Sequence, residues 1–276
     1  MKRPGPILVT DRFPQLRLRL IDLLSGLSDQ EWAVSTAAPR WSVKDIASHL
    51  LGGDIGILSR CRNGYSPGLQ PAPDFDDLVK LVNRLNDEWV TAARRISPRA
   101  LCELLEFTGP LVESYFASLD PFAIGQPVSW AGPDPAPVWF DIAREFTERW
   151  HHQQQIRDAT GRPALYDPYF LAPVLDAFVR ALPYSFRDTA AAVGTVVRLE
   201  ISGQSGGSWF LERTQPGWEL GLEAGAAPAA SVTIAEDLAW RLLTKGIDGE
   251  RARSRATIVG DASLASRIFA TIAVIA

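Results

Sequence analysis

Cysteine and histidine are scarce in this chain: its 276 residues include two cysteines and three histidines. Cys61 and Cys102 lie in separate segments and form no spaced motif. This usage excludes a disulfide framework and is typical of a protein in a reducing cytoplasm. No apolar run is long enough for a signal peptide or a membrane span. We therefore expect a cytoplasmic protein without a membrane partner.

The chain also has no excess of basic charge. Its formal net charge is -4 and its pI is near 5.5, and the short cluster at residues 251–255 is typical of a solvated surface. These values argue against nucleic acid as the main partner. Apolar residues make up 46% and charged residues 22% of the chain, as in soluble globular proteins. The length suits two domains of ordinary size.

The first half of the chain shows apolar residues at helical spacing. This periodicity and its end signals predict helices and connecting loops. The predicted helices cover residues 12–33, 41–64, 75–96, 98–118 and 138–160, with proline-rich loops at 66–73 and 120–137. Helices of this length with such connections favour a helix bundle. We predict this bundle over residues 1–165.

After residue 165 the sequence pattern changes from long helical segments to short segments that favour β-strands. Short β-rich runs lie between glycine and proline turns, with amphipathic helical segments around them. The predicted strands are 195–201, 208–213, 218–222, 230–234 and 256–259, and the predicted helices are 167–182, 236–245 and 261–275. Strands grouped in this way predict an α+β domain with a mostly antiparallel sheet over residues 166–276.

The three histidines fall in two of the predicted helices. Glu148 and His152 are four residues apart, so they lie on one face of a helix, one turn from each other. A carboxylate and an imidazole in this arrangement can bind one divalent metal ion. His49, from a second helix, would be the third ligand and would leave one position open for water or substrate. We therefore predict a metal site formed by His49, Glu148 and His152.

Each of these residues also has an ordinary structural interpretation. A lone His49 on an apolar helix face can be a core or surface histidine. Glu148 and His152 can form a helix-stabilising pair worth a few tenths of a kcal/mol. His151 is rotated by about 100 degrees from His152 and is an alternative ligand. Glu145 shares the face of His152 and is either an outer hydrogen-bond acceptor or a spare ligand.

Other side chains near these motifs also have two interpretations. Asp45 precedes His49 by one turn, where it would orient the imidazole or cap the helix; capping is the main expectation. Gln153–Gln155 are predicted as solvated helix surface, with polar groups at a pocket rim as the alternative. Trp130 and Trp139 are expected in the core, with a lid over the pocket as the alternative.

Two motifs together resemble the mycothiol-dependent maleylpyruvate isomerase family, a branch of the DinB-like metal-binding four-helix bundles. The first is the run Trp41-Ser-Val-Lys-Asp-Ile-Ala-Ser-His49-Leu. The second is Glu148-x-x-x-His152 with Gly161 nine residues further on. In the second half, Ser231-Val-Thr-Ile, Asp237-Leu-Ala-Trp-Arg-Leu-Leu and Ile258-Val-Gly-Asp-Ala-Ser-Leu-Ala resemble the sterol-carrier-protein-type domain that often follows this bundle.

The resemblance implies a divalent ion, with zinc the expected one, held by His49, Glu148 and His152. It also implies mycothiol or another low-molecular-weight thiol as a cosubstrate near the open metal position. The family's isomerase changes a double bond of a dicarboxylic keto acid from cis to trans, and related bundles transfer a thiol to an electrophile. Residues beyond the metal ligands that would contact the substrate or take part in catalysis are not identified.

Two functions from different classes therefore remain open. The preferred hypothesis is a metal-dependent, thiol-using isomerase or S-transferase that acts on a small electrophilic metabolite. The alternative is a carrier or binding protein, in which the C-terminal domain holds an apolar ligand and the metal site is structural or vestigial. A third hypothesis is that the open coordination position serves another reaction. The sequence does not determine the substrate, the thiol, the metal or the oligomeric state.

Overall fold

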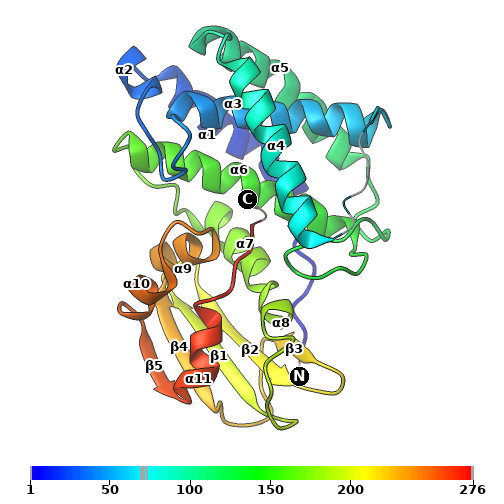
Figure 1. Ribbon diagram of the computed structural model, residues 1–276, viewed down its shortest axis with the longest axis vertical. Helices are drawn as coiled ribbons and strands as arrows, with labels where there is room; N and C mark the ends of the chain where they lie inside the picture. Colours follow the sequence, from blue (N-terminus) through cyan, green and yellow to red (C-terminus); the bar gives the residue numbers. More distant parts are fainter. Residues whose placement is uncertain (1, 69–71, 73, 275–276) are drawn as a thin grey trace. The chain divides into compact units, whose positions relative to one another are not determined.

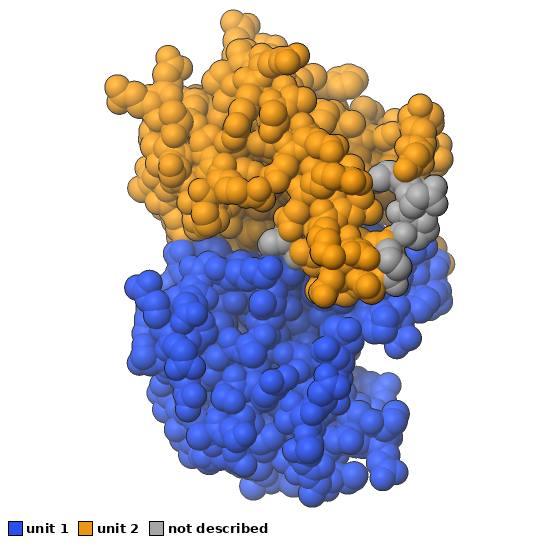
Figure 2. Space-filling view, in the orientation of Figure 1, with its two compact units in different colours: residues 1–7, 122–147, 166–274 blue, residues 8–121, 148–165, 275–276 orange. Residues whose placement is uncertain are grey.

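The computed structural model describes residues 2–68, 72 and 74–274, and these form two compact units (Figure 2). The bundle unit comprises the described residues of 8–121 and 148–165. The sheet unit comprises residues 2–7, 122–147 and 166–274. The longest helix contributes residues to both units. The division into domains at residues 1–165 and 166–276 stays a prediction.

Four helices, α1, α3, α5 and α6, contribute most of the core of the bundle unit (Figure 1). They supply buried residues such as Leu24, Ile46, Leu101 and Ile156 to one hydrophobic cluster. The helical elements are η1 (Thr10–Arg12), α1 (Phe13–Ser25), α2 (Asp29–Trp32), α3 (Val43–Gly56), the π-helical turn η2 (Ile57–Arg62), α4 (Phe75–Ala93), α5 (Pro98–Ala117) and α6 (Val138–Ala159).

The predicted first helix, residues 12–33, is divided in the structure into α1 and α2. Ser28 begins α2 as an N-cap: its hydroxyl accepts a hydrogen bond from the Glu31 backbone N–H, and the Glu31 carboxylate accepts one from the Ser28 N–H. This reciprocal pair stabilises a new helix start and interrupts the first helix. Of the predicted loop at 66–73, residues 69–71 and 73 lie outside the described residues.

The sheet unit contains one five-stranded sheet in the order β3-β2-β1-β4-β5. The pairing of β1 with β4 is parallel, and the other three pairings are antiparallel. The elements are α7 (Pro168–Val179), α8 (Leu182–Ser185), β1 (Val196–Ser202), β2 (Gly207–Arg213), β3 (Trp218–Gly221), β4 (Ala230–Ala235), α9 (Glu236–Leu243), α10 (Gly249–Arg253), β5 (Thr257–Gly260) and α11 (Ala262–Ile268).

Three strands of this sheet, β1, β2 and β4, alternate in burial over most of their length. In β1, Val197, Leu199 and Ile201 are buried, whereas Arg198 and Glu200, which alternate with them, are partly exposed and form an ion pair. The last helix is shorter than the predicted 261–275, because the backbone N–H of Ala273 donates to a carbonyl at the end of α9; residue 275 lies outside the described part.

The predicted fold class, a helix bundle followed by an α+β domain with a mostly antiparallel sheet, is confirmed. In the described part of the chain, none of the helices has an apolar stretch of the length needed to span a lipid bilayer.

Two adjacent glycines in α3 have opposite surroundings, which predicts opposite effects of alanine. A Cβ at Gly53 would meet no atom within 4 Å, so Gly53→Ala is expected to stabilise the protein by about 0.5–1 kcal/mol through helix propensity. A Cβ at Gly52 would lie 2.5 Å from the Trp89 ring, which the hydrogen bond from Trp89 Nε1 to the Ser48 carbonyl holds in place.

We therefore expect Gly52→Ala to destabilise the protein by roughly 1–3 kcal/mol, the usual cost of overpacking. Hydrogen exchange of the α3 amides in both variants and in the unmodified chain measures the two effects. Equal effects of the two substitutions would contradict the packing shown here.

Candidate metal centre

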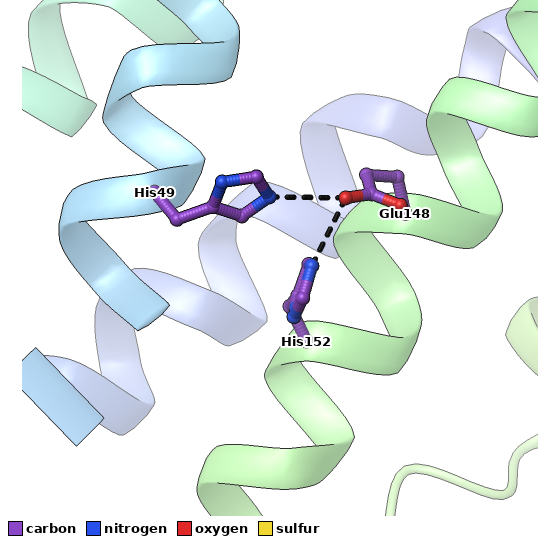
Figure 3. A group of neighbouring side chains, drawn as sticks. All are labelled: His49, Glu148 and His152. Atoms are coloured by element: carbon purple, nitrogen blue, oxygen red, sulfur yellow. Dashed lines mark hydrogen bonds and ion pairs between the residues drawn. The ribbon is translucent and has the colours of Figure 1, made fainter. Parts of the chain in front are cut away.

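The structure brings His49, Glu148 and His152 to one point (Figure 3). His49 comes from α3, and Glu148 and His152 come from successive turns of α6. Glu148 Oε1 lies 3.0 Å from His49 Nε2 and 3.0 Å from His152 Nε2. One ligand atom from each residue lies within 4.8 Å of the other two. The three side chains therefore meet the geometric requirement of a shared cation site.

The centre is largely shielded, and its carboxylate is the most accessible member. The side chains of His49, Glu148 and His152 are 13%, 32% and 8% exposed. Burial by itself raises the pKa of Glu148. The charge and hydrogen bond of His152, the hydrogen bond of His49 and the charge of His151 outweigh burial and hold this pKa well below its ordinary value. Glu148 is thus ionised and able to act as a ligand.

Aromatic contacts restrict both imidazoles. The Trp41 ring centroid lies 4.8 Å from that of His49 and 6.3 Å from that of His152. The two imidazoles are themselves 4.7 Å apart, edge to face. Such packing limits the rotamers of the side chains and keeps their Nε2 atoms directed toward Glu148.

His151 lies beside the three-residue cluster and is not one of its members. Its ring stacks on His152 with centroids 4.0 Å apart. Its Nδ1 is 3.9 Å from Glu148 Oε2, the carboxylate oxygen that does not face the two other histidines. The geometry therefore favours His152 over His151 as the ligand of α6.

The prediction that Gln153–Gln155 form solvated helix surface is wrong. These residues are 0%, 0% and 8% exposed. The neighbouring residues of α6 from Trp150 to Ile156 are buried as well, so this part of the helix has no solvent-facing side. The Gln153 amide donates to the carbonyl of Leu16 in α1. The Gln154 amide donates to Asp158. Gln155 Oε1 lies 2.9 Å from His152 Nδ1. The spacing of three residues from His152 is the signal from which sequence reasoning could have found this contact.

The other candidate residues have structural partners. Glu145 pairs with Arg144, whose Nη2 is 2.6 Å from Glu145 Oε1. Trp130 is buried and packs edge to face against Phe140, and Trp139 also stacks near Phe140. Trp130 therefore lies in the core, as the main expectation had it, whereas Trp139 is only partly buried.

Asp45 caps α3, which is the role mainly expected of it. Its carboxylate accepts hydrogen bonds from the Ser42 backbone and hydroxyl, and from Arg94 Nε and Nη2 at 3.0 and 3.2 Å. Burial by itself raises the pKa of Asp45. The hydrogen bonds from Arg94 and Ser42, together with the charge of Arg94, outweigh burial and lower this pKa from its ordinary value of 3.8.

This lowered pKa predicts a loss of stability in acid. A carboxyl group whose pKa is lower in the folded than in the unfolded chain stabilises the fold above the unfolded value, here about 3.9. The stabilisation is lost as the pH falls through the folded pKa. We expect Asp45→Asn to cost about 1 kcal/mol at neutral pH, comparable to a lost cap, and less as the pH falls below about 4. Protection of the α3 amides from hydrogen exchange, compared between the two proteins across this range, checks the effect, and a constant difference would contradict it.

The donor set fits a divalent metal ion. Two imidazole nitrogens and one carboxylate oxygen are a ligand set that zinc takes in open, catalytic sites. A tetrahedral ion with bonds of about 2.0–2.1 Å holds neighbouring ligand atoms roughly 3.3 Å apart. The observed 3.0 Å separations around Glu148 Oε1 are close to this spacing. Three protein ligands would leave a fourth position for a small molecule.

A family model matches the helices that carry this centre. Described as the mycothiol maleylpyruvate isomerase N-terminal domain, it matches residues 13–157, more than half of the chain. The matched range contains His49, Glu148 and His152. A comparison with curated proteins finds no match.

The chain is also similar to solved structures. A mutant of the mycothiol-dependent maleylpyruvate isomerase, with one histidine replaced by alanine, has a TM-score of 0.55 and 11% identity, with 90% of each chain covered. Another crystal structure of the mycothiol-dependent maleylpyruvate isomerase has a TM-score of 0.53 and 12% identity, with 84% of this chain and 86% of that chain covered. A UbiJ-SCP2 ubiquinone synthesis protein matches 29% of this chain and 69% of that chain, with a TM-score of 0.23 and 18% identity. At these identities, the likeness to the isomerase structures shows a shared fold.

Proposed function

This chain belongs to the mycothiol maleylpyruvate isomerase family, and from that premise we propose that it is a metal-dependent enzyme that uses a low-molecular-weight thiol. The proposed reaction is the isomerisation of a small electrophilic metabolite, or the transfer of the thiol to it. The convergence of His49, Glu148 and His152 carries this proposal. We place the reaction in the cytoplasm, where thiols are kept reduced.

The proposed roles of the three residues follow from their chemistry. His49 and His152 would each bind the ion through Nε2 of a neutral imidazole, and Glu148 through its ionised carboxylate. A divalent ion held there supplies Lewis acidity and lowers the pKa of a coordinated thiol, which is ordinarily about 8.5. The packing of Trp41 against His49 keeps this side of the centre ordered and partly shielded from water.

The proposed substrate class follows from what a thiolate can do. Its sulfur adds to an alkene carbon conjugated with a carbonyl group, which converts the double bond to a single bond. Rotation about that bond, followed by elimination of the same thiolate, restores the alkene in the other geometry. The thiol is therefore regenerated in an isomerisation and consumed in a transfer. A cis-configured keto acid is the expected kind of substrate.

Metal content and thiol-dependent turnover, measured together, test this function. We expect about one zinc ion per chain. We also expect turnover of conjugated electrophiles with mycothiol, and loss of turnover when the thiol is omitted or the metal is removed by a chelator. Native mass spectrometry of the protein from its host gives an independent result. A retained apolar molecule, with no metal and no thiol dependence, would overturn the proposal in favour of the carrier.

A further inference from the structure

Gln155 lies directly behind one of the proposed metal ligands. It is on α6, three residues after His152, and its side-chain carbonyl oxygen is 2.9 Å from His152 Nδ1. The contact is buried, with Gln155 only 8% exposed. The other ring nitrogen of His152, Nε2, is directed at Glu148 Oε1 (Figure 3). The imidazole is therefore held from both ends.

The chemistry of this contact indicates which ring nitrogen of His152 keeps its proton when an ion binds the other one. A carbonyl oxygen only accepts hydrogen bonds, so the Nδ1 atom that faces it must donate. In a neutral imidazole with its proton on Nδ1, the lone pair is on Nε2, which is the atom that points into the centre. In the opposite tautomer, a proton on Nε2 would occupy the direction from which a metal ion must bind.

We propose that Gln155 is a positioning residue of the metal centre: its carbonyl oxygen fixes the Nδ1–H tautomer of His152 and thereby presents the Nε2 lone pair to the ion. The inference rests on the proposed function, because it takes His152 as a ligand. Outer hydrogen-bond partners of this kind orient metal-binding histidines in many proteins.

The neighbouring glutamines show that this role belongs to Gln155 and is not shared by every buried amide on α6. The Gln153 amide donates to the Leu16 carbonyl and accepts from Arg157. The Gln154 amide donates to Asp158 and accepts from the Leu165 backbone N–H. These two side chains connect α6 to its surroundings, whereas Gln155 bonds to a ligand.

An amide at this position also sets the charge of the centre. Glu148 is the one carboxylate among the three ligands, so two neutral imidazoles and a divalent ion leave a net charge of about +1. A carboxylate in place of Gln155 would accept the same proton from Nδ1 but would neutralise that charge. The neutral amide therefore orients His152 and preserves the electrophilic character of the ion.

The test compares three variants of the full chain by Zn²⁺ affinity, measured by competition with a chromophoric chelator. Gln155→Leu keeps most of the side-chain volume and removes the acceptor, and its affinity is expected to fall about 10–100-fold. Gln155→Glu restores an acceptor and is expected to bind Zn²⁺ at least as tightly as the unmodified chain. Gln153→Leu is the matched control: it loses a buried amide on the same helix and is expected to keep its affinity.

A second readout reports the tautomer directly. In the Zn²⁺-bound protein, nitrogen-edited NMR is expected to show a protected Nδ1 proton on His152, which disappears in Gln155→Leu and returns in Gln155→Glu. A purely structural role of Gln155 would leave this signal unchanged. Gln155→Met, which is unbranched and more adaptable, replaces the leucine variant if the latter does not fold.

The outcomes separate this inference from the proposed function. If the unmodified chain binds no Zn²⁺, or binds it independently of His152, the proposed function fails. If the unmodified chain binds Zn²⁺ through His152 but Gln155→Leu retains the same affinity and the same Nδ1 proton, only the role of Gln155 is overturned.

Discussion

Replacing His152 by alanine is expected to remove stoichiometric metal from the protein. His152 supplies one of three converging ligand atoms, 3.0 Å from Glu148 Oε1. Two remaining protein ligands would bind a divalent ion much more weakly. The loss of affinity should therefore exceed the roughly 10–100-fold that removal of an outer partner costs. Elemental analysis after dialysis against a metal buffer, with Zn²⁺ titration of the metal-free chain, measures the effect.

The adjacent histidine supplies a matched control for this prediction. His151 is the same residue type on the same helix, is also buried, and its Nδ1 lies 3.9 Å from Glu148 Oε2. His151→Ala is therefore expected to retain about one ion per chain. Unchanged metal in His152→Ala would count heavily against the centre. Loss of metal in His151→Ala, with metal retained in His152→Ala, would show that His151 is the ligand and that His152 is not.

The buried ion pair between Asp54 and Arg149 gives the largest expected effect on stability. Asp54 is 5% exposed and accepts hydrogen bonds from Arg149 Nη2 and from the Thr108 hydroxyl, both at 2.8 Å. The pair joins α3 to α6, the two helices that carry the proposed ligands. Arg149→Leu removes the cation and leaves a carboxylate among buried groups, so we expect a loss of about 3–5 kcal/mol.

The physical cause of this loss can be separated from lost packing by a double variant. Asp54→Leu combined with Arg149→Leu removes both charges, and it is expected to be more stable than Arg149→Leu alone. The exposed pair of Arg99 and Glu103, with side chains 90% and 59% exposed, is the control. Arg99→Leu should change stability by at most about 0.5 kcal/mol, because exposed ion pairs contribute little.

Hydrogen exchange of the α3 and α6 amides is the appropriate measurement for this pair. A chain with two compact units does not satisfy two-state unfolding, so a single transition would mix their contributions. Amide exchange reports the free energy of opening for each helix separately. Protection in Arg149→Leu equal to that of the unmodified chain would show that the pair does not stabilise the bundle.

Local patterns in the sequence were sufficient for most elements and for two of the three proposed metal ligands. The spacing of Glu148 and His152 follows from helix geometry alone, because residues four apart lie on one face whatever the helix packs against. Ser42 followed by Asp45 likewise marks the start of α3, and the structure shows both hydrogen bonds of that cap. The resemblance of the run that ends at His49 to a family motif is also a feature of the sequence alone, and it predicts His49 as the third ligand.

Tertiary packing decided the contacts and the burial of residues whose neighbours are distant in the sequence. His49 and Glu148 are 99 residues apart, and their 3.0 Å contact exists because α3 and α6 pack side by side. The burial of Gln153–Gln155 had the same origin: polar side chains are usually exposed, and segments packed around α6, such as α1 at Leu16 and the chain at Leu165, contact them.

The sequence by itself therefore determined the helices, the strands and the residue types of the centre, because these depend on spacing along one element. Only the tertiary structure decided that His49 lies 3.0 Å from Glu148 and that Gln153–Gln155 are buried. These depend on how separate helices pack, and a single sequence carries no local signal for the orientation of one helix relative to another.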